Sequence, residues 1–342
     1  MRIVFFGTAE FAVPSLEAVI AAGHEVLAVV TQPDKPQGRG RQLVASPIKM
    51  AAERRGLPVL QPRRVRFDSF LAIMRDLSPD VLALAAFGQV IPQALLDLPP
   101  LGPINVHGSL LPKYRGAAPI QRALMAGETE TGVTTMWMDA TLDTGDMLLE
   151  ASLTVAPDDT AGTLTPRLAL LGADLLIQTL EGLQNGTLAR RKQDGSQATF
   201  APAITPEDGI IRWEESASGI CNRIRGVSPK PGAYSQIKGK RVKIVTALPV
   251  ASLPLQTPSL QSPLSVSGKT QPDNQETSLE FGSEPGTVIG RQKSPAGLLV
   301  AAGSGTVLLL TAVQPDNGKR MAASDWALGQ RLVQGDKFGP HV

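Results

Sequence analysis

Short apolar runs typical of buried strands alternate, through roughly the first 185 residues, with longer runs that carry apolar residues at helical spacing. The predicted strands are Arg2–Phe6, Glu25–Thr31, Val81–Ala86 and Ile104–His107, and the predicted helices are Phe11–Ala22 and Thr163–Leu183. Strands that are apolar on both faces, as Val81–Ala86 is, belong to parallel sheets covered by helices. The alternation therefore predicts an α/β fold with a Rossmann-like parallel sheet and ligands outside the carboxyl ends of its strands.

The character of the chain changes after residue 186. Residues 187–205 are polar and lack a strong period, which indicates a linker. Residues 206–342 contain one helical segment, Ser216–Arg225, and several short β-rich runs separated by turn residues. This pattern predicts that a small C-terminal β-barrel domain of the OB-like kind follows an N-terminal domain of residues 1–186.

Residues 251–285 interrupt the predicted barrel. They include 7 Ser, 5 Pro, 4 Gln and 3 Thr, so 19 of 35 residues belong to these types. Such a composition buries too little apolar surface to offset the entropy cost of ordering the chain. We therefore interpret this segment as a disordered insertion between barrel strands, a spacer without a function of its own.

Composition and motifs exclude several classes of protein. The single cysteine, Cys221, rules out a disulfide within the chain and fits a reducing compartment. One cysteine and three scattered histidines provide no metal-ligand cluster. Gly7 stands alone at the first strand-to-helix turn, so neither the dinucleotide-binding nor the P-loop motif is present. The N-terminus reads as a strand rather than a signal peptide, and no apolar run approaches the ~20 residues that cross a bilayer. We therefore expect a cytoplasmic protein that makes no membrane contact.

The stretch INVHGSLLPKYRG carries the most specific chemistry. Asn105 and His107 lie two residues apart on a predicted strand, so their side chains share a face near its carboxyl end. A buried amide and imidazole are costly unless they are satisfied or used. The downstream loop LDTGD can bring the carboxylate of Asp143 or of Asp146 to the same edge. An amide, a protonated imidazole and a carboxylate can support acyl transfer or hydrolysis without a covalent intermediate.

These motifs resemble the formyltransferase family that uses 10-formyltetrahydrofolate. The resemblance is carried by INVHGSLLPKYRGAAPIQRAL followed by MDATLDTGDML, and it covers nearly everything except residues 251–285. It implies that Asn105, His107 and Asp143 are the catalytic residues, with a folate as formyl donor and no metal. The implied folate contacts are Ser109, Leu110, Leu111 and Pro112, with Phe87 and Gly88 as weaker assignments.

Within that family, the resemblance is closest to members that formylate the α-amino group of methionine on initiator methionyl-tRNA, which supplies formylmethionyl-tRNA for translation initiation. Two basic stretches favour this RNA acceptor. Residues 34–66 include nine basic and two acidic residues, and residues 222–243 include seven basic residues and no acidic one. Basic stripes on a chain whose net charge is only +2 are typical of phosphate contacts. The expected tRNA contacts are Lys35, Arg39, Arg41, Lys240 and Arg241.

Two other classes of function stay open. Relatives with the same Asn, His and Asp formylate a glycinamide ribonucleotide or an amino sugar nucleotide, and another member hydrolyses or oxidises formylfolate. A folate-binding or RNA-binding protein that has lost catalysis is the second alternative, although the intact trio argues against it. The basic C-terminal domain favours the tRNA acceptor, since an enzyme with a small substrate has no evident need for it. We expect the protein to be a monomer.

Overall fold

The computed structural model describes residues 1–37, 42–250 and 283–339. They form two compact units, Met1–Ile204 and Thr205–Val342. The insertion predicted at 251–285 lies, except for its last three residues, outside the described residues. None of the helices in the described parts of the chain is long and apolar enough to span a membrane.

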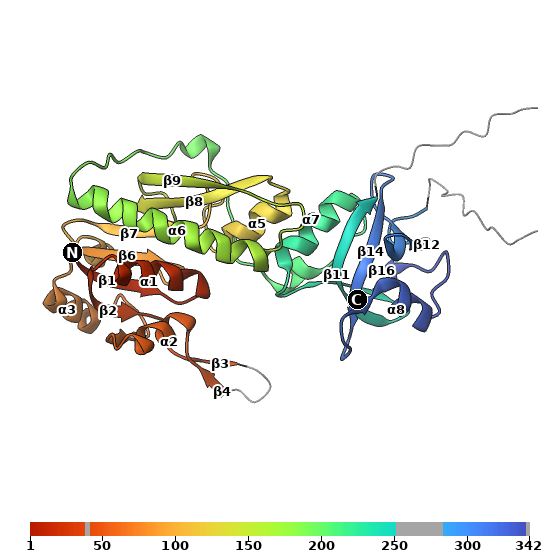
Figure 1. Ribbon diagram of the computed structural model, residues 1–342, viewed down its shortest axis with the longest axis horizontal. Helices are drawn as coiled ribbons and strands as arrows, with labels where there is room; N and C mark the ends of the chain where they lie inside the picture. The colour runs from red at the N-terminus through yellow and green to blue at the C-terminus, as the bar shows by residue number, and fades with distance from the viewer. Residues whose placement is uncertain (38–41, 251–282, 340–342) are drawn as a thin grey trace, which may run out of the picture. The chain divides into compact units, whose positions relative to one another are not determined.

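A seven-stranded sheet organises the first unit (Figure 1). In spatial order its strands are β5 (Val59–Leu60), β2 (Glu25–Val30), β1 (Arg2–Gly7), β6 (Val81–Ala85), β7 (Pro103–His107), β8 (Glu130–Trp137) and β9 (Met147–Thr154). The strands from β5 to β7 are parallel, whereas β8 pairs antiparallel with both of its neighbours, β7 and β9. The sheet is therefore mostly parallel, as the sequence predicts, with an antiparallel hairpin at one edge that the sequence analysis did not find.

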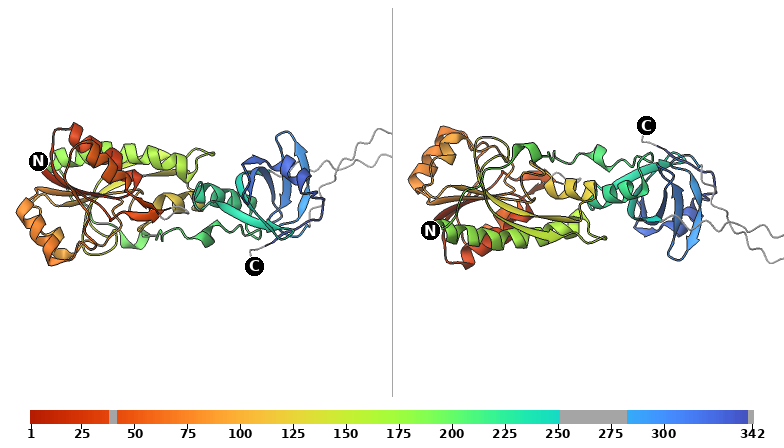
Figure 2. Two further views of the ribbon diagram at one scale, coloured as in Figure 1. Left: turned by 90° about the horizontal axis from the view of Figure 1, so that it is seen from below. Right: turned by 90° about the horizontal axis from the view of Figure 1, so that it is seen from above.

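Helices cover both faces of the sheet. They are α1 (Val13–Ala21), α2 (Pro47–Arg54), α3 (Asp68–Leu77), α4 (Gln93–Leu96), α5 (Pro119–Ala126) and α6 (Ala161–Gln184), with short 3-10 turns at η1 (Glu10–Ala12) and η2 (Gly195–Gln197). One apolar core joins α1, α2, α5 and α6 to the sheet, and a second joins α3 and α4 to its other face. Helices α1 and α6 lie side by side on the first face (Figures 1 and 2).

The predicted strands and both predicted helices of this unit are confirmed by β1, β2, β6, β7, α1 and α6. The basic Pro- and Gly-rich stretch after β2 adds an antiparallel hairpin of β3 (Lys35–Gln37) and β4 (Gln42–Val44). Strands β1 and β6 are neighbours, and the chain proceeds from β1 to β2 on one side and from β6 to β7 on the other. Ligands of open α/β sheets bind at such a reversal of strand order.

The second unit is an antiparallel-sheet domain. Its strands are β10 (Ala233–Ile237), β11 (Lys240–Val250), β12 (Val288–Lys293), β13 (Ala296–Ala301), β14 (Val307–Pro315), β15 (Met321–Ala322) and β16 (Phe338–Gly339). The spatial order is β12-β13-β14-β11-β10-β16, with β15 paired to β14. Its helices are η3 (Pro206–Gly209), α7 (Ala217–Val227) and α8 (Ala323–Gly329). The Phe338 ring lies 5.0 Å from that of Trp213 and 6.3 Å from that of Trp326, so these aromatic rings form part of the core.

The N-terminus of helix α6 is closed by a capping box. The Thr160 hydroxyl accepts from the Thr163 backbone N–H, and the Thr163 hydroxyl accepts from the Thr160 backbone N–H. The buried carboxylate of Asp159 accepts hydrogen bonds from the Ala156 backbone at 2.8 Å and the Thr163 hydroxyl at 2.9 Å, and it pairs with Arg167. Burial alone opposes the charged form, but these hydrogen bonds outweigh burial and lower the pKa of Asp159 below its usual value.

Replacement of the Asp159 carboxylate tests its contribution to the stability of the fold. A folded-state pKa below the unfolded value means that Asp159 stabilises the fold above its unfolded pKa, and that this contribution is lost as pH falls through the folded pKa. We expect Asp159→Asn to lower the free energy of unfolding by about 1–3 kcal/mol at pH 7, because charge-assisted hydrogen bonds are lost. Urea denaturation of both proteins should give a smaller difference below about pH 3.9.

The exposed neighbour Asp158 supplies the matched control, since Asp158→Asn removes one carboxylate from the same loop. A difference between wild type and Asp159→Asn that stays constant from pH 7 to acid would contradict the assigned role of the ionised group.

Candidate active site

Strand β7 carries Asn105 and His107 to the carboxyl edge of the sheet. Ile104 and Val106 belong to the core beneath α5 and α6, so the alternation of the strand turns Asn105 and His107 toward the other face. His107 is 5% exposed. Asn105 is half-buried, and no hydrogen bond of its amide is found within the described part of the chain. The strand therefore presents an amide and an imidazole on one face, as the sequence predicts.

The loop after β7 folds back over that face. Thr134 on β8 accepts from the Leu111 backbone at 3.1 Å and donates to the Ser109 carbonyl at 2.8 Å. Ser109 in turn donates to the Lys113 carbonyl at 2.6 Å. The Leu111 side chain packs against two methionines of β8 and β9, Met136 and Met147. The Ser109 and Leu111 side chains are buried within the loop, so they shape it rather than project from it.

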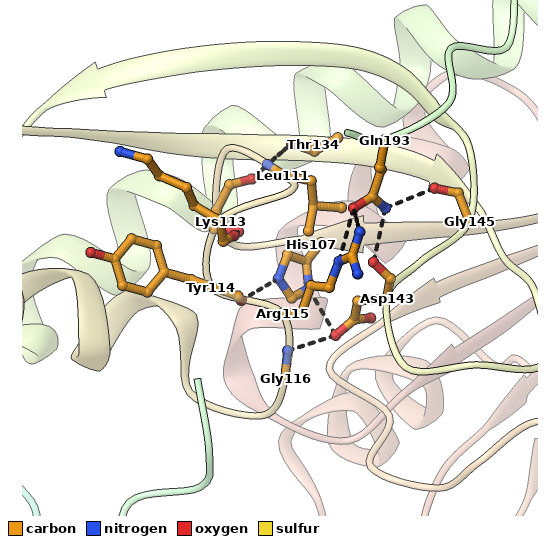
Figure 3. Close-up of polar contacts among 11 residues, drawn as sticks. His107, Leu111, Lys113, Tyr114, Arg115, Gly116, Thr134, Asp143, Gly145 and Gln193 are labelled. Atoms are coloured by element: carbon orange, nitrogen blue, oxygen red, sulfur yellow. Dashed lines mark hydrogen bonds and ion pairs between the residues drawn. The ribbon is translucent and has the colours of Figure 1, made fainter. Parts of the chain in front are cut away.

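The structure brings His107 and Asp143 together (Figure 3). His107 Nε2 lies 3.0 Å from the carbonyl oxygen of Tyr114 and carries the hydrogen, because a carbonyl only accepts. The other ring nitrogen, Nδ1, faces Asp143 Oδ2 at 3.7 Å. Both side chains are largely buried, with exposed fractions of 6% for His107 and 14% for Asp143. The carboxylate of Asp143 therefore faces the ring nitrogen that does not bind Tyr114.

Asp143 is held in an unusual backbone conformation. Its φ angle is +53°, in the left-handed region that few residues other than glycine adopt. Its Oδ2 atom accepts from the Gly116 backbone at 2.8 Å, so the loop after β7 also orients the carboxylate. The residue pattern alone left Asp143 and Asp146 as alternatives, the family resemblance implied Asp143, and in the structure Asp143 lies against His107. The backbone carbonyl of Asp146 instead accepts from Trp137 at 2.8 Å and closes the β8–β9 hairpin.

Two polar residues of the site were missed by sequence reasoning. The amide of Gln193, in the predicted linker, donates to the carbonyls of Asp143 and Gly145, each at 2.8 Å, and accepts from Arg115 (Figure 3). Arg115 is 8% exposed. A polar segment without periodicity carries no local sign of such contacts, and the burial of Arg115, which makes a partner necessary, is seen only in the folded structure.

The loop after β6 contains the predicted contacts Phe87 and Gly88. The Phe87 ring is buried edge-on against Phe6, with ring centres 5.2 Å apart. Its carbonyl accepts from Thr8 at 2.8 Å and from Gln32 at 3.0 Å, and Gln32 also donates to the Gly88 carbonyl. Phe87 therefore fixes the loop, and Gly88 is among its exposed residues.

A cavity of about 540 Å³ adjoins Gly88 at the same end of the sheet. The cations that line it are Lys35, Arg63, Arg64 and Arg66. No ion pair of these cations with an acid is found among the described residues. Asp34, also in the lining, pairs with Lys49 at 2.8 Å. This hydrogen bond lowers the pKa of Asp34 and raises that of Lys49. The cavity is therefore positively charged, and it brings together Gly88 and Lys35, which the sequence assigned to different ligands.

The other predicted RNA contacts differ in their exposure and in their partners. Arg39 and Arg41 lie outside the described residues. Lys240 is exposed and donates to Gln330 at 3.0 Å, and the Arg241 guanidinium stacks on Tyr234 at 3.7 Å from the ring centre. Other cations of the same stretch are paired with acids, namely Arg223 with Glu215 and Lys238 with Asp336. The charge of the second basic stretch is therefore smaller than a count along the sequence indicates.

The single cysteine of the chain, Cys221, is buried. Burial raises the pKa of the Cys221 thiol to about 12, so the thiol stays protonated at neutral pH. Within the described ranges, no three His, Cys, Asp or Glu side chains are grouped to hold a metal ion. The amide, imidazole and carboxylate at the end of β7 are thus the reactive groups that the geometry assembles.

Two family models match the chain. The model described as Formyl transferase matches residues 1–180, and the model described as Formyl transferase, C-terminal domain, matches residues 203–331. Together they cover the sheet that carries the site and most of the antiparallel-sheet domain. The chain belongs to the formyltransferase family, whose members transfer a one-carbon group.

Curated relatives narrow the assignment within that family. A methionyl-tRNA formyltransferase from Solibacter usitatus is 47% identical over 339 residues, and one from Syntrophus aciditrophicus is 46% identical over 339 residues. Each alignment covers 99% of this chain and 99% of the relative. Within the family, the chain therefore belongs with the methionyl-tRNA formyltransferases.

Solved structures share the fold at lower identity. WlaRD, a sugar 3N-formyl transferase whose structure was determined in the presence of dTDP and 5-N-formyl-THF, is 17% identical with a TM-score of 0.61, over 93% of this chain and 99% of WlaRD. HypX from Aquifex aeolicus, in complex with tetrahydrofolic acid, is 16% identical with a TM-score of 0.56. That alignment covers 96% of this chain and 47% of HypX.

The turn that carries Asp143 leaves no room for a side chain at Gly145. A Cβ there would lie 1.8 Å from the carbonyl oxygen of Trp137. We expect Gly145→Ala to lower the free energy of unfolding by about 1–3 kcal/mol, as measured by urea denaturation, because the hairpin backbone must shift. Gly195→Ala is the matched control, since no atom of the described residues lies within 4 Å of its added Cβ. Equal midpoints for the two variants would contradict the close approach.

Proposed function

We propose that this protein transfers the formyl group of 10-formyltetrahydrofolate to the α-amino group of methionine on initiator methionyl-tRNA. The observation that carries the proposal is the alignment of 99% of the chain with 99% of relatives named methionyl-tRNA formyltransferase. The product, formylmethionyl-tRNA, is used to initiate translation. The site at the end of β7 supplies groups that suit this reaction.

In the proposed reaction, the neutral amine of methionine attacks the formyl carbon. A tetrahedral oxyanion forms, and the bond from this carbon to the folate nitrogen then breaks. The Asn105 amide and His107, in its protonated form in this proposal, would stabilise the oxyanion, since both side chains lie on one face of β7. Asp143 would hold His107 and take the proton that the amine loses, which is returned to the folate nitrogen. The transfer needs no covalent enzyme intermediate.

Folate would lie along the loops that follow β6 and β7. Among the proposed contacts, Leu110 and Pro112 are half-buried and Gly88 is exposed, so they can present surface to a ligand. Ser109, Leu111 and Phe87 are buried, and they would act by holding the backbone of the two loops. Both substrates are anionic, which fits the cations of the adjoining cavity.

The tRNA would be bound by both units. Lys35 at the cavity is supported as a contact by its exposure and by the neighbouring arginines. Arg39 and Arg41 are proposed on the resemblance alone. In the second unit, the exposed Lys240 and the stacked Arg241 can reach phosphate or a base. Residues 206–342 would form the tRNA-binding domain, residues 1–186 the catalytic domain and residues 187–205 the connection.

We further propose that the antiparallel sheet of the second unit closes into an OB-like barrel. Three backbone hydrogen bonds support closure between β12 and the segment of β16. Val288 donates to Asp336 at 2.7 Å, Gly335 to Val288 at 3.0 Å, and Phe338 to Gly286 at 2.8 Å. OB-folds present a strand face to single-stranded or looped nucleic acid. A monomeric protein in the cytoplasm, where charged initiator tRNA is used, completes the proposal.

The acceptor decides between this function and its alternatives. We expect the protein to formylate methionine-charged initiator tRNA and not methionine-charged elongator tRNA, with 10-formyltetrahydrofolate as donor. The readout is the acid-stable formylmethionine released from each tRNA after deacylation. Formylation of neither tRNA, with folate still bound, would contradict the proposal and point to a small-molecule formyltransferase or an inactive folate binder.

His107 tests the assigned chemistry. We expect His107→Ala and the bulkier His107→Gln to lower kcat by about 10²–10⁴-fold, since a proton donor at the reacting centre is lost. Circular dichroism and the urea midpoint should stay close to wild type for at least one of them. His24→Ala, at a histidine that contacts the N-terminal amino group, is the control and should retain turnover. Wild-type turnover in both His107 variants would refute the assignment.

A further inference from the structure

The polar segment at residues 190–201, here called the strap, is part of the active-site framework. The Arg190 guanidinium stacks 3.1 Å from the ring centre of Trp137, and Arg191 pairs with the backbone of Met147. Farther along, the backbones of Thr199 and Ala201 exchange hydrogen bonds with Arg115. The strap thus runs from the edge of the sheet to the loop after β7.

Gln193 is the residue of the strap that reaches the Asp143 turn. Its Nε2 atom donates to the carbonyls of Asp143 and Gly145, and its Oε1 atom accepts from both Nε and Nη2 of Arg115. The partners fix the orientation of the amide, because carbonyls only accept and a guanidinium only donates. All four hydrogen-bonding sites of the side chain face groups of the active-site loops (Figure 3).

These contacts join the two loops that set the His107–Asp143 geometry. Arg115 lies between Tyr114, whose carbonyl binds His107, and Gly116, whose N–H binds Asp143. Gln193 ties Arg115 to the turn that carries Asp143. Left-handed backbone at a residue other than glycine persists only where its surroundings hold it, and Gln193 binds the carbonyl of Asp143 itself.

We propose that Gln193 is a positioning residue for formyl transfer and acts through Asp143. It touches neither substrate in this role: its two donated hydrogen bonds hold the Asp143 turn so that the carboxylate meets His107. Arg115 anchors the amide from the other side. The expected effect on kcat rests on the proposed function. The expected support of the Asp143 turn rests on the described contacts alone.

Kinetics of three variants test the proposal. Gln193→Leu removes all four hydrogen bonds, whereas Gln193→Glu keeps the acceptors for Arg115 and loses both donors. We expect each to lower kcat by about 10- to 100-fold, because small displacements of a catalytic group have effects of this size. The KM values for folate and tRNA should stay within about 3-fold, since substrate contacts remain. Gln197→Leu is the matched control, since Gln197 lies in the same strap and its side chain donates, within the described part of the chain, to Asp194 alone.

A double-mutant cycle separates positioning from general stability. Where Asp143 is already replaced by Ala, Gln193→Leu should lower the residual kcat by less than about 3-fold, because no carboxylate is left to position. The same loss in both backgrounds would overturn the proposal, as would a Gln193→Glu variant with wild-type kcat.

A readout without substrates keeps this test independent of the proposed function. We expect hydrogen exchange at the Gly116 amide, which donates to Asp143, to be at least about tenfold faster in Gln193→Leu than in wild type or Gln197→Leu. Unchanged exchange would overturn the inference even in an active enzyme. Faster exchange in a protein that formylates no methionyl-tRNA would sustain the structural inference while the proposed function fails.

Discussion

The approach of the Asp143 carboxylate to His107 is the contact on which the other features of the site depend. The two residues lie on β7 and on the turn after β8, so the contact exists only if the antiparallel hairpin is correctly paired with the parallel sheet. The loop after β7 supplies a backbone acceptor for His107 and a backbone donor for Asp143. A buried imidazole and carboxylate are costly when unpaired, so each of these contacts also contributes to the stability of the loop.

The antiparallel edge explains why this end of the sheet is open to chemistry. Helices α3 and α4 cover the second face over β1 and β6, whereas over β8 and β9 the loop after β7 takes their place through Leu111. A loop leaves its backbone donors and acceptors available where a helix would use them internally. The reactive groups consequently lie under a loop rather than beneath a layer of packed helices.

Strands and helices with a clear period were predictable from the sequence, and the contacts that orient the site were not. The apolar residues of β1, β6 and α6 are enough to predict these elements. Strand β8 instead has two polar residues, Thr134 and Thr135, in its centre. Their partners, the Ser109 carbonyl and the Thr179 hydroxyl, are brought to them only by folding. Spacing placed Asn105 and His107 on one face, whereas spacing alone did not choose between Asp143 and Asp146; the family resemblance implied Asp143, and the three-dimensional turn places it against His107. A count of charges along the chain likewise could not anticipate that Arg223 faces Glu215.

Because of the strap, the catalytic part of the molecule extends farther along the chain than the sequence pattern indicates. The sequence changes character at residue 186 and the first family match stops at residue 180, yet Gln193 and the backbone of Ala201 contact the active-site loops. A fragment trimmed at either position would retain every reactive side chain and lose the support of the Asp143 turn. The segment that joins the two units therefore belongs to the first of them, and exchange of C-terminal domains between relatives would have to leave it in place.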